Sequence, residues 1–159
     1  MSYRIAVVCL GNICRSPMAH VVLEDRLARA GLADRVEVVS AGTGDWHVGK
    51  PMDRRAAALL TEHGYDATRH RAQQTDVDLF AGVDLVLAMD AQNQADLQAL
   101  DDRLEVRMFR DFDPLARDGD RDVPDPYYGG DDGFEEVLAM VERTADALVD
   151  RLARTGDAG

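Results

Sequence analysis

Cys9 and Arg15 are the first candidates for a reactive site in this chain, because only five residues separate them in the segment CLGNICRSP, residues 9–17. A cysteine supplies a sulfur nucleophile, and an arginine is a planar fork that holds two oxygens of a phosphate. An apolar run, residues 5–8, precedes the segment and is typical of a buried strand. Ser16-Pro17 is typical of a helix N-cap and first helical position. A strand, a tight loop and a helix N-terminus in this order aim backbone N–H groups at one point, which predicts an oxyanion-binding loop with Cys9 at its edge.

The segment also contains a glycine, an asparagine, a second cysteine and a Ser-Pro pair, and this order resembles the signature of the low-molecular-weight protein tyrosine phosphatases. A buried cysteine with a surface arginine would explain none of these further positions. The resemblance covers nearly the whole chain. It implies that Cys9 is the nucleophile and that Arg15 clamps the phosphate. It also implies that the other residues of this phosphate-binding loop, or P-loop, bind the substrate: Leu10, Gly11, Asn12, Ile13, Cys14 and Ser16.

A proton donor for the leaving oxygen is the next requirement of phosphate ester cleavage through a thiolate. Asp125 lies in the sequence DPYYG, within a long polar segment, residues 110–133. By itself an Asp-Pro pair is more typical of a turn. The pair resembles the family's Asp-Pro-Tyr motif, however, and this resemblance implies that Asp125 is the general acid. The alternative donors in or near this segment are Asp122, Asp131 and Asp132.

Aromatic residues are expected to form the pocket walls if the leaving group is a phenol, because flat rings gain from stacking. Trp46 lies in a polar loop that contains several glycines, residues 42–50, where a core role is not expected. The resemblance implies that Trp46 and Tyr127 flank the substrate ring.

Asn12 is the residue of the loop that best tolerates a left-handed backbone. The resemblance implies that three further side chains keep the loop rigid together with Asn12, namely Ser16, Ser40 and His70. The chain departs from the family at His20, where an acidic residue is usual, and at Gln73, where an arginine is frequent. No site argument applies to His20, His47 or His63.

Cys14 has two interpretations, a small buried side chain that supports the loop or a thiol that protects Cys9 from irreversible oxidation. The resemblance favours protection, in which a sulfenic acid on Cys9 is captured as a disulfide.

Three other functions compete with the phosphatase interpretation. Thioredoxin-coupled arsenate reductases share the loop and the fold, but they need further cysteines for a disulfide relay, and none follows Cys14. A non-catalytic phosphotyrosine-binding module would be expected to lack the nucleophile or the acid. The spacing of Cys9 and Cys14 does not suit a zinc site.

Alternating apolar strand and amphipathic helix patterns predict an α/β fold with a parallel sheet. The strands are expected over residues 4–9, 36–40, 83–89 and 106–109, and the helices over residues 17–30, 53–64, 77–80, from 90 and from 134. This is a single-domain, doubly wound, four-stranded parallel sheet with helices on both faces, and the resemblance implies the strand order 2-1-3-4. Ligands bind such sheets at the carboxyl ends of the strands, which is where the Cys9 loop lies. We expect residues 1–154 to form the domain and residues 155–159 to be a frayed tail.

Composition restricts the partners. The 159 residues carry a formal net charge of −12, which argues against a nucleic-acid partner, and no apolar run is long enough to span a membrane. Two cysteines this close together are no disulfide framework, and a free thiol fits a reducing compartment. We therefore expect a cytoplasmic monomer that needs no cofactor or metal and acts on proteins that contain phosphotyrosine.

Overall fold

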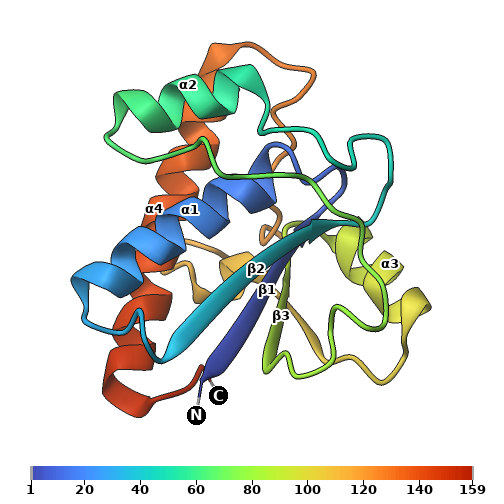
Figure 1. Ribbon diagram of the computed structural model, residues 1–159, viewed down its shortest axis with the longest axis vertical. Coiled ribbons are helices and arrows are strands. Elements are labelled where there is room, and N and C mark those ends of the chain that lie inside the picture. The colour runs from blue at the N-terminus through green and yellow to red at the C-terminus, as the bar shows by residue number, and fades with distance from the viewer. Residues whose placement is uncertain (1, 159) are drawn as a thin grey trace.

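A four-stranded parallel sheet forms the centre of the computed structural model, which describes residues 2–158 (Figure 1). The strands are β1 (Tyr3–Cys9), β2 (Val36–Gly42), β3 (Leu85–Ala88) and β4 (Val106–Met108). Their order is β2-β1-β3-β4, and Val7 at the centre of β1 pairs with Ser40 and Leu87. The predicted sheet and its strand order are confirmed.

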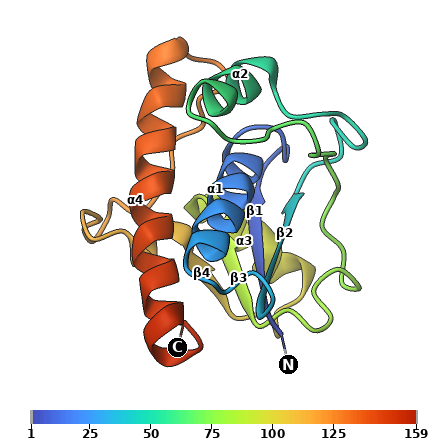
Figure 2. The same ribbon diagram turned by 60° about the vertical axis from the view of Figure 1, so that its left-hand side comes forward.

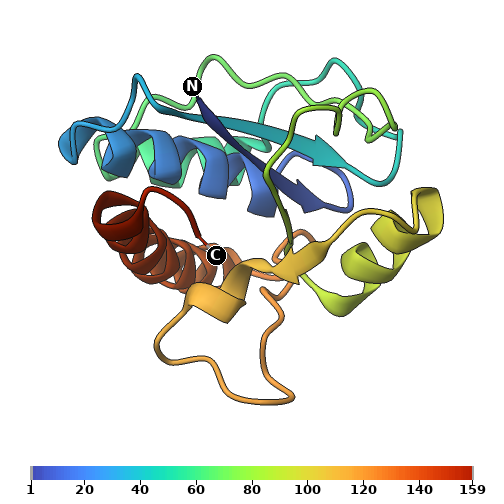
Figure 3. The same ribbon diagram turned by 90° about the horizontal axis from the view of Figure 1, so that it is seen from below.

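Helices cover both faces of this sheet, as predicted. They are α1 (Arg15–Arg29), α2 (Arg54–Glu62), α3 (Ala91–Leu100) and α4 (Asp131–Thr155), with a short 3₁₀ helix, η1 (Phe109–Phe112), after β4. Figure 3 shows α1 and α4 on one face and α3 on the other. In Figure 2, α2 lies beside the N-terminal end of α4.

The alternation of side chains along β1 builds two cores. Ile5, Val7 and Cys9 belong to a large apolar cluster on the face covered by α1 and α4, whereas Ala6 and Val8 belong to a smaller cluster on the α3 face. A strand buried on both faces reads as an uninterrupted apolar run, which is what made β1 recognisable in the sequence.

Helix starts were predicted correctly where an aspartate caps them. Asp53 accepts from the backbone N–H groups of Arg55 and Ala56, and Asp90 accepts from that of Asn93. The predicted Ser16 cap is wrong, because α1 begins at Arg15 and its N-cap residue is Cys14.

Two further predictions need correction. Residues 77–80 form turns rather than a helix. Helix α4 begins at Asp131 rather than Phe134, since acidic residues in a first turn stabilise the helix dipole. Of the expected tail, residues 155–159, Thr155 ends α4 and Ala158 is buried, with its carbonyl 3.2 Å from Arg107 Nη1, whereas Gly159 lies outside the described residues. Within residues 2–158, no helix has both the length and the apolar character needed to cross a membrane.

Candidate active site

The predicted oxyanion-binding loop leaves the carboxyl end of β1 and runs into α1 (Figure 1). Asn12 has a φ of 56°, which confirms the expected left-handed residue. The end of β2 packs closely against this loop at Gly42, where a Cβ atom would lie 2.8 Å from the carbonyl oxygen of Leu10 and 3.0 Å from the nitrogen of Asn12. Only glycine therefore permits this approach.

Cys9 lies at the base of the loop, with 2% of its surface exposed. Its Sγ atom is 3.0 Å from Ser16 Oγ, and the backbone N–H of Asn12 donates to it at 3.3 Å. The hydroxyl of Ser16 thus contacts the sulfur instead of capping α1. Both neighbours can donate a hydrogen bond to the sulfur.

The side chain of Arg15 is only 3% exposed, and its guanidinium binds two acceptors. Its Nη1 donates to Asp90 Oδ2 at 2.6 Å and to the carbonyl of Val123 at 3.0 Å. Burial alone would lower the pKa of this guanidinium, but the adjacent Cys9 and the bond to Asp90 outweigh burial and raise it. The side chain is therefore a fixed cation with its fork already oriented.

A network of hydrogen bonds from Asn12 stiffens the loop. Asn12 Nδ2 donates to Ser16 Oγ at 2.8 Å and to Ser40 Oγ at 3.1 Å, while its Oδ1 accepts from the backbone of Gln73. The Nε2 of His70 lies 2.6 Å from the Asn12 carbonyl. Burial lowers the pKa of His70, so the neutral ring donates this bond. The structure thus brings together all the side chains expected to support the loop.

His20 also joins this network, which the sequence argument missed. Its Nδ1 lies 3.2 Å from Ser40 Oγ, and its Nε2 lies 3.5 Å from Glu24 Oε1, one turn further along α1. The signal available in the sequence was its position on α1 one turn after Ser16, since residues four apart lie on the same helix face.

Asp125 reaches the same site from the loop that precedes α4. Its Oδ1 accepts from the backbone N–H of Tyr127 at 3.1 Å, and its Oδ2 lies 3.5 Å from Arg15 Nη2. The side chain is 34% exposed. None of the other candidate donors lines the pocket above Cys9. Asp122 accepts from the backbone of Ala91, Asp131 lines a separate hollow between α2 and α4, and Asp132 is exposed.

A pocket of about 350 Å³ opens over these groups. Trp46, which is 67% exposed, and Tyr127 form part of its wall. The described residues that line it are Cys9, Leu10, Gly11, Ile13, Cys14, Arg15, Trp46, His47, Asp125, Tyr127 and Tyr128. The side chains of Asn12 and Ser16, expected among the substrate-binding residues, lie instead buried behind the loop.

The profile of one protein family, described as "Low molecular weight phosphotyrosine protein phosphatase", matches residues 4–158. The chain belongs to this family. A low molecular weight protein-tyrosine-phosphatase of Streptomyces coelicolor is 49% identical over 153 residues, which are 94% of this chain and 93% of the relative. Low molecular weight protein-tyrosine phosphatase A of Mycobacterium tuberculosis is 46% identical over 96% of this chain and 95% of its own. The crystal structure of YfkJ from Bacillus subtilis superimposes with a TM-score of 0.89 at 30% identity, covering 97% of this chain and 96% of that one.

Two further residues of this phosphatase-family site were not identified from the sequence. His47 lines the pocket next to Trp46, and Asp90 bonds Arg15 although we predicted it only as a helix cap. Asp90 lies two residues after the end of β3, so the rule that sites form at the carboxyl ends of parallel strands would have placed it beside the Cys9 loop. His47 carries no comparable sequence signal.

Cys14 is buried and lines the same pocket. Burial, and then the negative charge of Asp53, raise the pKa of its thiol. Cys14 is therefore a neutral thiol in this conformation. Both cysteines are free.

Proposed function

We propose that this protein hydrolyses aryl phosphate monoesters, with phosphotyrosine in proteins as the natural substrate class. The observation that carries the proposal is one pocket in which Cys9, Arg15 and Asp125 converge beneath the aromatic walls of Trp46 and Tyr127. Family membership supports the same activity.

In the first step, the thiolate of Cys9 attacks phosphorus in line with the phenolic oxygen. Arg15 and the backbone N–H groups of the loop hold the three non-bridging oxygens, where charge is concentrated in the transition state. The proton of the Asp125 carboxyl group passes to the phenolic oxygen as the P–O bond breaks. The products are a phenol and a cysteinyl-phosphate.

In the second step, the Asp125 carboxylate takes a proton from a water molecule that attacks the cysteinyl-phosphate. The P–S bond breaks, inorganic phosphate leaves, and the thiolate of Cys9 is restored. A cytoplasmic location and sensitivity to oxidants are part of the proposal, because both follow from a free thiol nucleophile.

The alternative enzyme, an arsenate reductase of the same fold, is disfavoured because the chain has no cysteine after Cys14 for a disulfide relay. A non-catalytic phosphotyrosine-binding module is disfavoured because the nucleophile and the acid line one pocket.

The test is hydrolysis of an aryl phosphate with a metal chelator present, run beside an arsenate reduction assay. We expect turnover of the ester, no effect of the chelator and no arsenate reduction. Cys9→Ser should abolish turnover but still bind inorganic phosphate, because Arg15 and the loop N–H groups remain. Substantial turnover by Cys9→Ser, loss of activity with chelator, or efficient arsenate reduction would refute the proposal.

A further inference from the structure

Arg55 connects the loop that carries Asp125 to α2, although it does not line the pocket above Cys9. Its Nη2 donates to the carbonyl of Tyr127 at 2.9 Å, and its Nη1 donates to that of Gly129 at 3.4 Å. A single guanidinium therefore binds two carbonyl groups of one short turn, which matches the fork geometry of arginine.

Tyr127 connects Arg55 to Asp125, the expected general acid, through hydrogen bonds of its backbone. The carbonyl of Tyr127 accepts from Arg55, while its N–H donates to Asp125 Oδ1 at 3.1 Å. Among residues 2–158, the Asp125 carboxylate has two polar contacts: this N–H, and Arg15 Nη2 at 3.5 Å. A shift of the Tyr127 backbone would therefore move the acid.

The same guanidinium packs against the aromatic wall. Its central carbon is 5.6 Å from the centre of the Tyr127 ring and 4.7 Å from that of Phe134, in the first turn of α4. Contacts of this kind between a cation and a ring face are attractive. Arg55 thus restrains both the backbone and the ring of Tyr127.

Asp53 links the same guanidinium to the oxyanion-binding loop. The backbone N–H of Asp53 donates to the carbonyl of Ile13 at 2.9 Å. Its carboxylate pairs with Arg55, with Nε–Oδ1 and Nη2–Oδ2 distances of 3.3 Å each. A continuous set of polar contacts therefore runs from the loop that holds the phosphate to the loop that holds the acid.

We propose that Arg55 is a positioning residue that sets where Asp125 and the ring of Tyr127 stand relative to the phosphate held by the Cys9 loop. The inference rests on the proposed function, because Asp125 must act as the acid for its placement to matter. Proton transfer requires the donor within hydrogen-bonding distance of the leaving oxygen, so a small displacement removes much of its effect.

The experiment uses Arg55→Met, which keeps an unbranched stem for packing on Phe134, and Arg55→Lys, which keeps the charge but loses the fork. Arg54→Met is the matched control. It removes the same charge from the neighbouring residue, which is exposed and whose side chain makes no hydrogen bond or ion pair among residues 2–158. Rates are measured with phenyl phosphate, a poor leaving group, and with nitrophenyl phosphate, an activated one.

We expect Arg55→Met to lower kcat at least about tenfold with phenyl phosphate but less than about threefold with the nitrophenyl ester. Arg55→Lys should show the same pattern, Arg54→Met should show neither loss, and inhibition by inorganic phosphate should change less than about twofold in all three. A loss equal for both esters, or no loss, would overturn the proposal. If Arg55→Met does not fold by circular dichroism, Arg55→Lys decides by the same criteria.

A double-mutant cycle separates positioning from a general structural effect. In an Asp125→Asn background, adding Arg55→Met should lower the phenyl phosphate rate less than about twofold, because the group it positions is no longer an acid. An undiminished tenfold loss would refute the role through Asp125. If the unmodified protein does not hydrolyse aryl phosphates, or if the rate loss in Asp125→Asn does not depend on the leaving group, the proposed function itself fails. If Asp125→Asn shows that dependence but the Arg55 variants keep the rate of the unmodified protein, only the positioning role of Arg55 is refuted.

Discussion

Cys9 and Asp125 share one pocket but are held very differently. Cys9 is almost completely buried, and its sulfur contacts Ser16 and the Asn12 backbone. Asp125 is a third exposed and lies on a turn that restrains it through the N–H of Tyr127. The nucleophile is therefore fixed by the core, whereas the acid depends on the loop that carries it.

Asp125→Asn keeps the size of the side chain and removes its proton. We expect a rate loss of about 10²–10⁴ for poor leaving groups and a smaller one for activated esters, because only poor leaving groups need protonation. The measurement is the slope of log kcat against the pKa of the leaving phenol. Asp132→Asn, at an exposed position outside the pocket, is the control. A small loss of equal size for all esters would show that Asp125 only forms a turn.

Cys14→Ser tests whether the second cysteine protects the first. Capture would join the Cys9 sulfenic acid to the Cys14 thiol, forming a disulfide and releasing water. After mild peroxide and then a reductant, the unmodified protein should regain most of its initial activity, whereas Cys14→Ser should regain little of its own. Mass spectrometry should detect a Cys9–Cys14 link in the oxidised protein. Equal recovery with no link would leave Cys14 as a packing residue.

At the scale of elements, the pocket walls come from two loops that are far apart in the sequence. Trp46 and His47 lie in the loop between β2 and α2, and Tyr127 lies between η1 and α4. Trp46 folds onto Gly44, where a Cβ atom would lie 2.0 Å from the indole ring. Selectivity for a flat leaving group therefore depends on how these loops meet above the Cys9 loop.

Trp46→Ala should weaken the preference for phosphotyrosine over phosphoserine peptides. An aromatic pair contributes about 0.5–1.5 kcal/mol beyond burial, so we expect kcat/KM for the phosphotyrosine peptide to fall roughly two- to tenfold. Val48→Ala, an exposed apolar residue of the same loop that does not line the pocket, is the control. Comparable kinetics of the unmodified protein on both peptides would contradict an aromatic slot.

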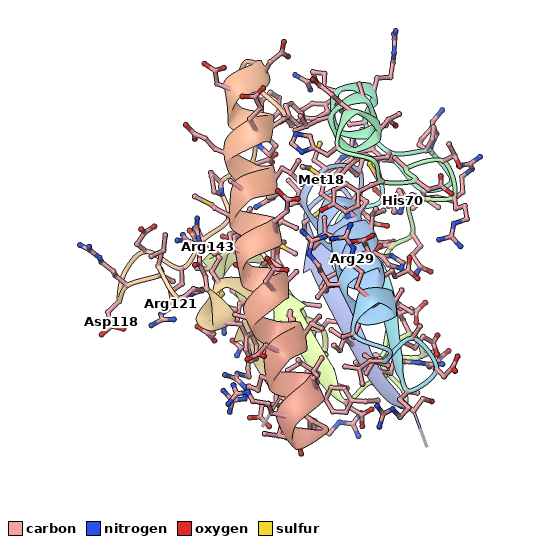
Figure 4. The ribbon with its side chains drawn as sticks, turned by 90° about the vertical axis from the view of Figure 1, so that its left-hand side faces the viewer. Met18, Arg29, His70, Asp118, Arg121 and Arg143 are labelled. Carbon is pink, nitrogen blue, oxygen red and sulfur yellow. The ribbon has the colours of Figure 1, made fainter. Side chains whose placement is uncertain are left out.

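At the scale of the whole molecule, one buried carboxylate joins η1, α4 and the projecting loop that leads to Asp125. Asp113 has no exposed side-chain surface and accepts from Arg143 Nε and Nη2 at 2.7 and 2.8 Å, from Arg110 Nε at 2.9 Å and from the N–H of Leu115 at 2.8 Å. Figure 4 shows Arg143 on α4 beside this loop, which carries Asp118 and Arg121 further out. Burial alone would raise the pKa of Asp113, but Arg143 and its other partners hold it well below its usual range.

Asp113→Asn should therefore destabilise the fold, by about 3–5 kcal/mol, because it leaves two arginines without their buried partner. Urea unfolding at pH 7 measures this difference. Asp118→Asn is the control, since Asp118 is fully exposed and solvent screens its ion pair with Arg121 at 3.4 Å. If Asp113→Asn changed the stability no more than this control, the role of the cluster would be contradicted.

The stability of the unmodified protein and of Asp113→Asn can also be compared as a function of pH. A carboxylate whose pKa is lowered by folding contributes its full stability above its unfolded pKa, about 3.9, and loses it as pH falls further. The stability difference between the unmodified protein and Asp113→Asn should accordingly be constant near neutrality and shrink below about pH 4. A difference that stays constant down to pH 2 would show that packing, not charge, is responsible.

The parallel sheet and several local conformations could be predicted from the residues alone. The apolar run before Cys9, the tolerance of Asn12 for a left-handed backbone and the caps at Asp53 and Asp90 all depend on residues close together in the chain, and all were predicted. Ser16 shows the limit of this reasoning: it stands where a cap is expected, but the neighbouring Cys9 and Asn12 occupy its hydroxyl instead.

The partner that each polar group takes depends on the three-dimensional packing of the chain. Arg15 bonds a residue 75 positions away, His20 reaches Ser40 on β2, and Arg55 holds the carbonyl of Tyr127 across 72 positions. The physical reason is that a hydrogen bond requires its two atoms within about 3 Å. Residue type limits what a side chain can bind, but the packing of α1, α2 and the loops around the sheet determines what lies within that distance.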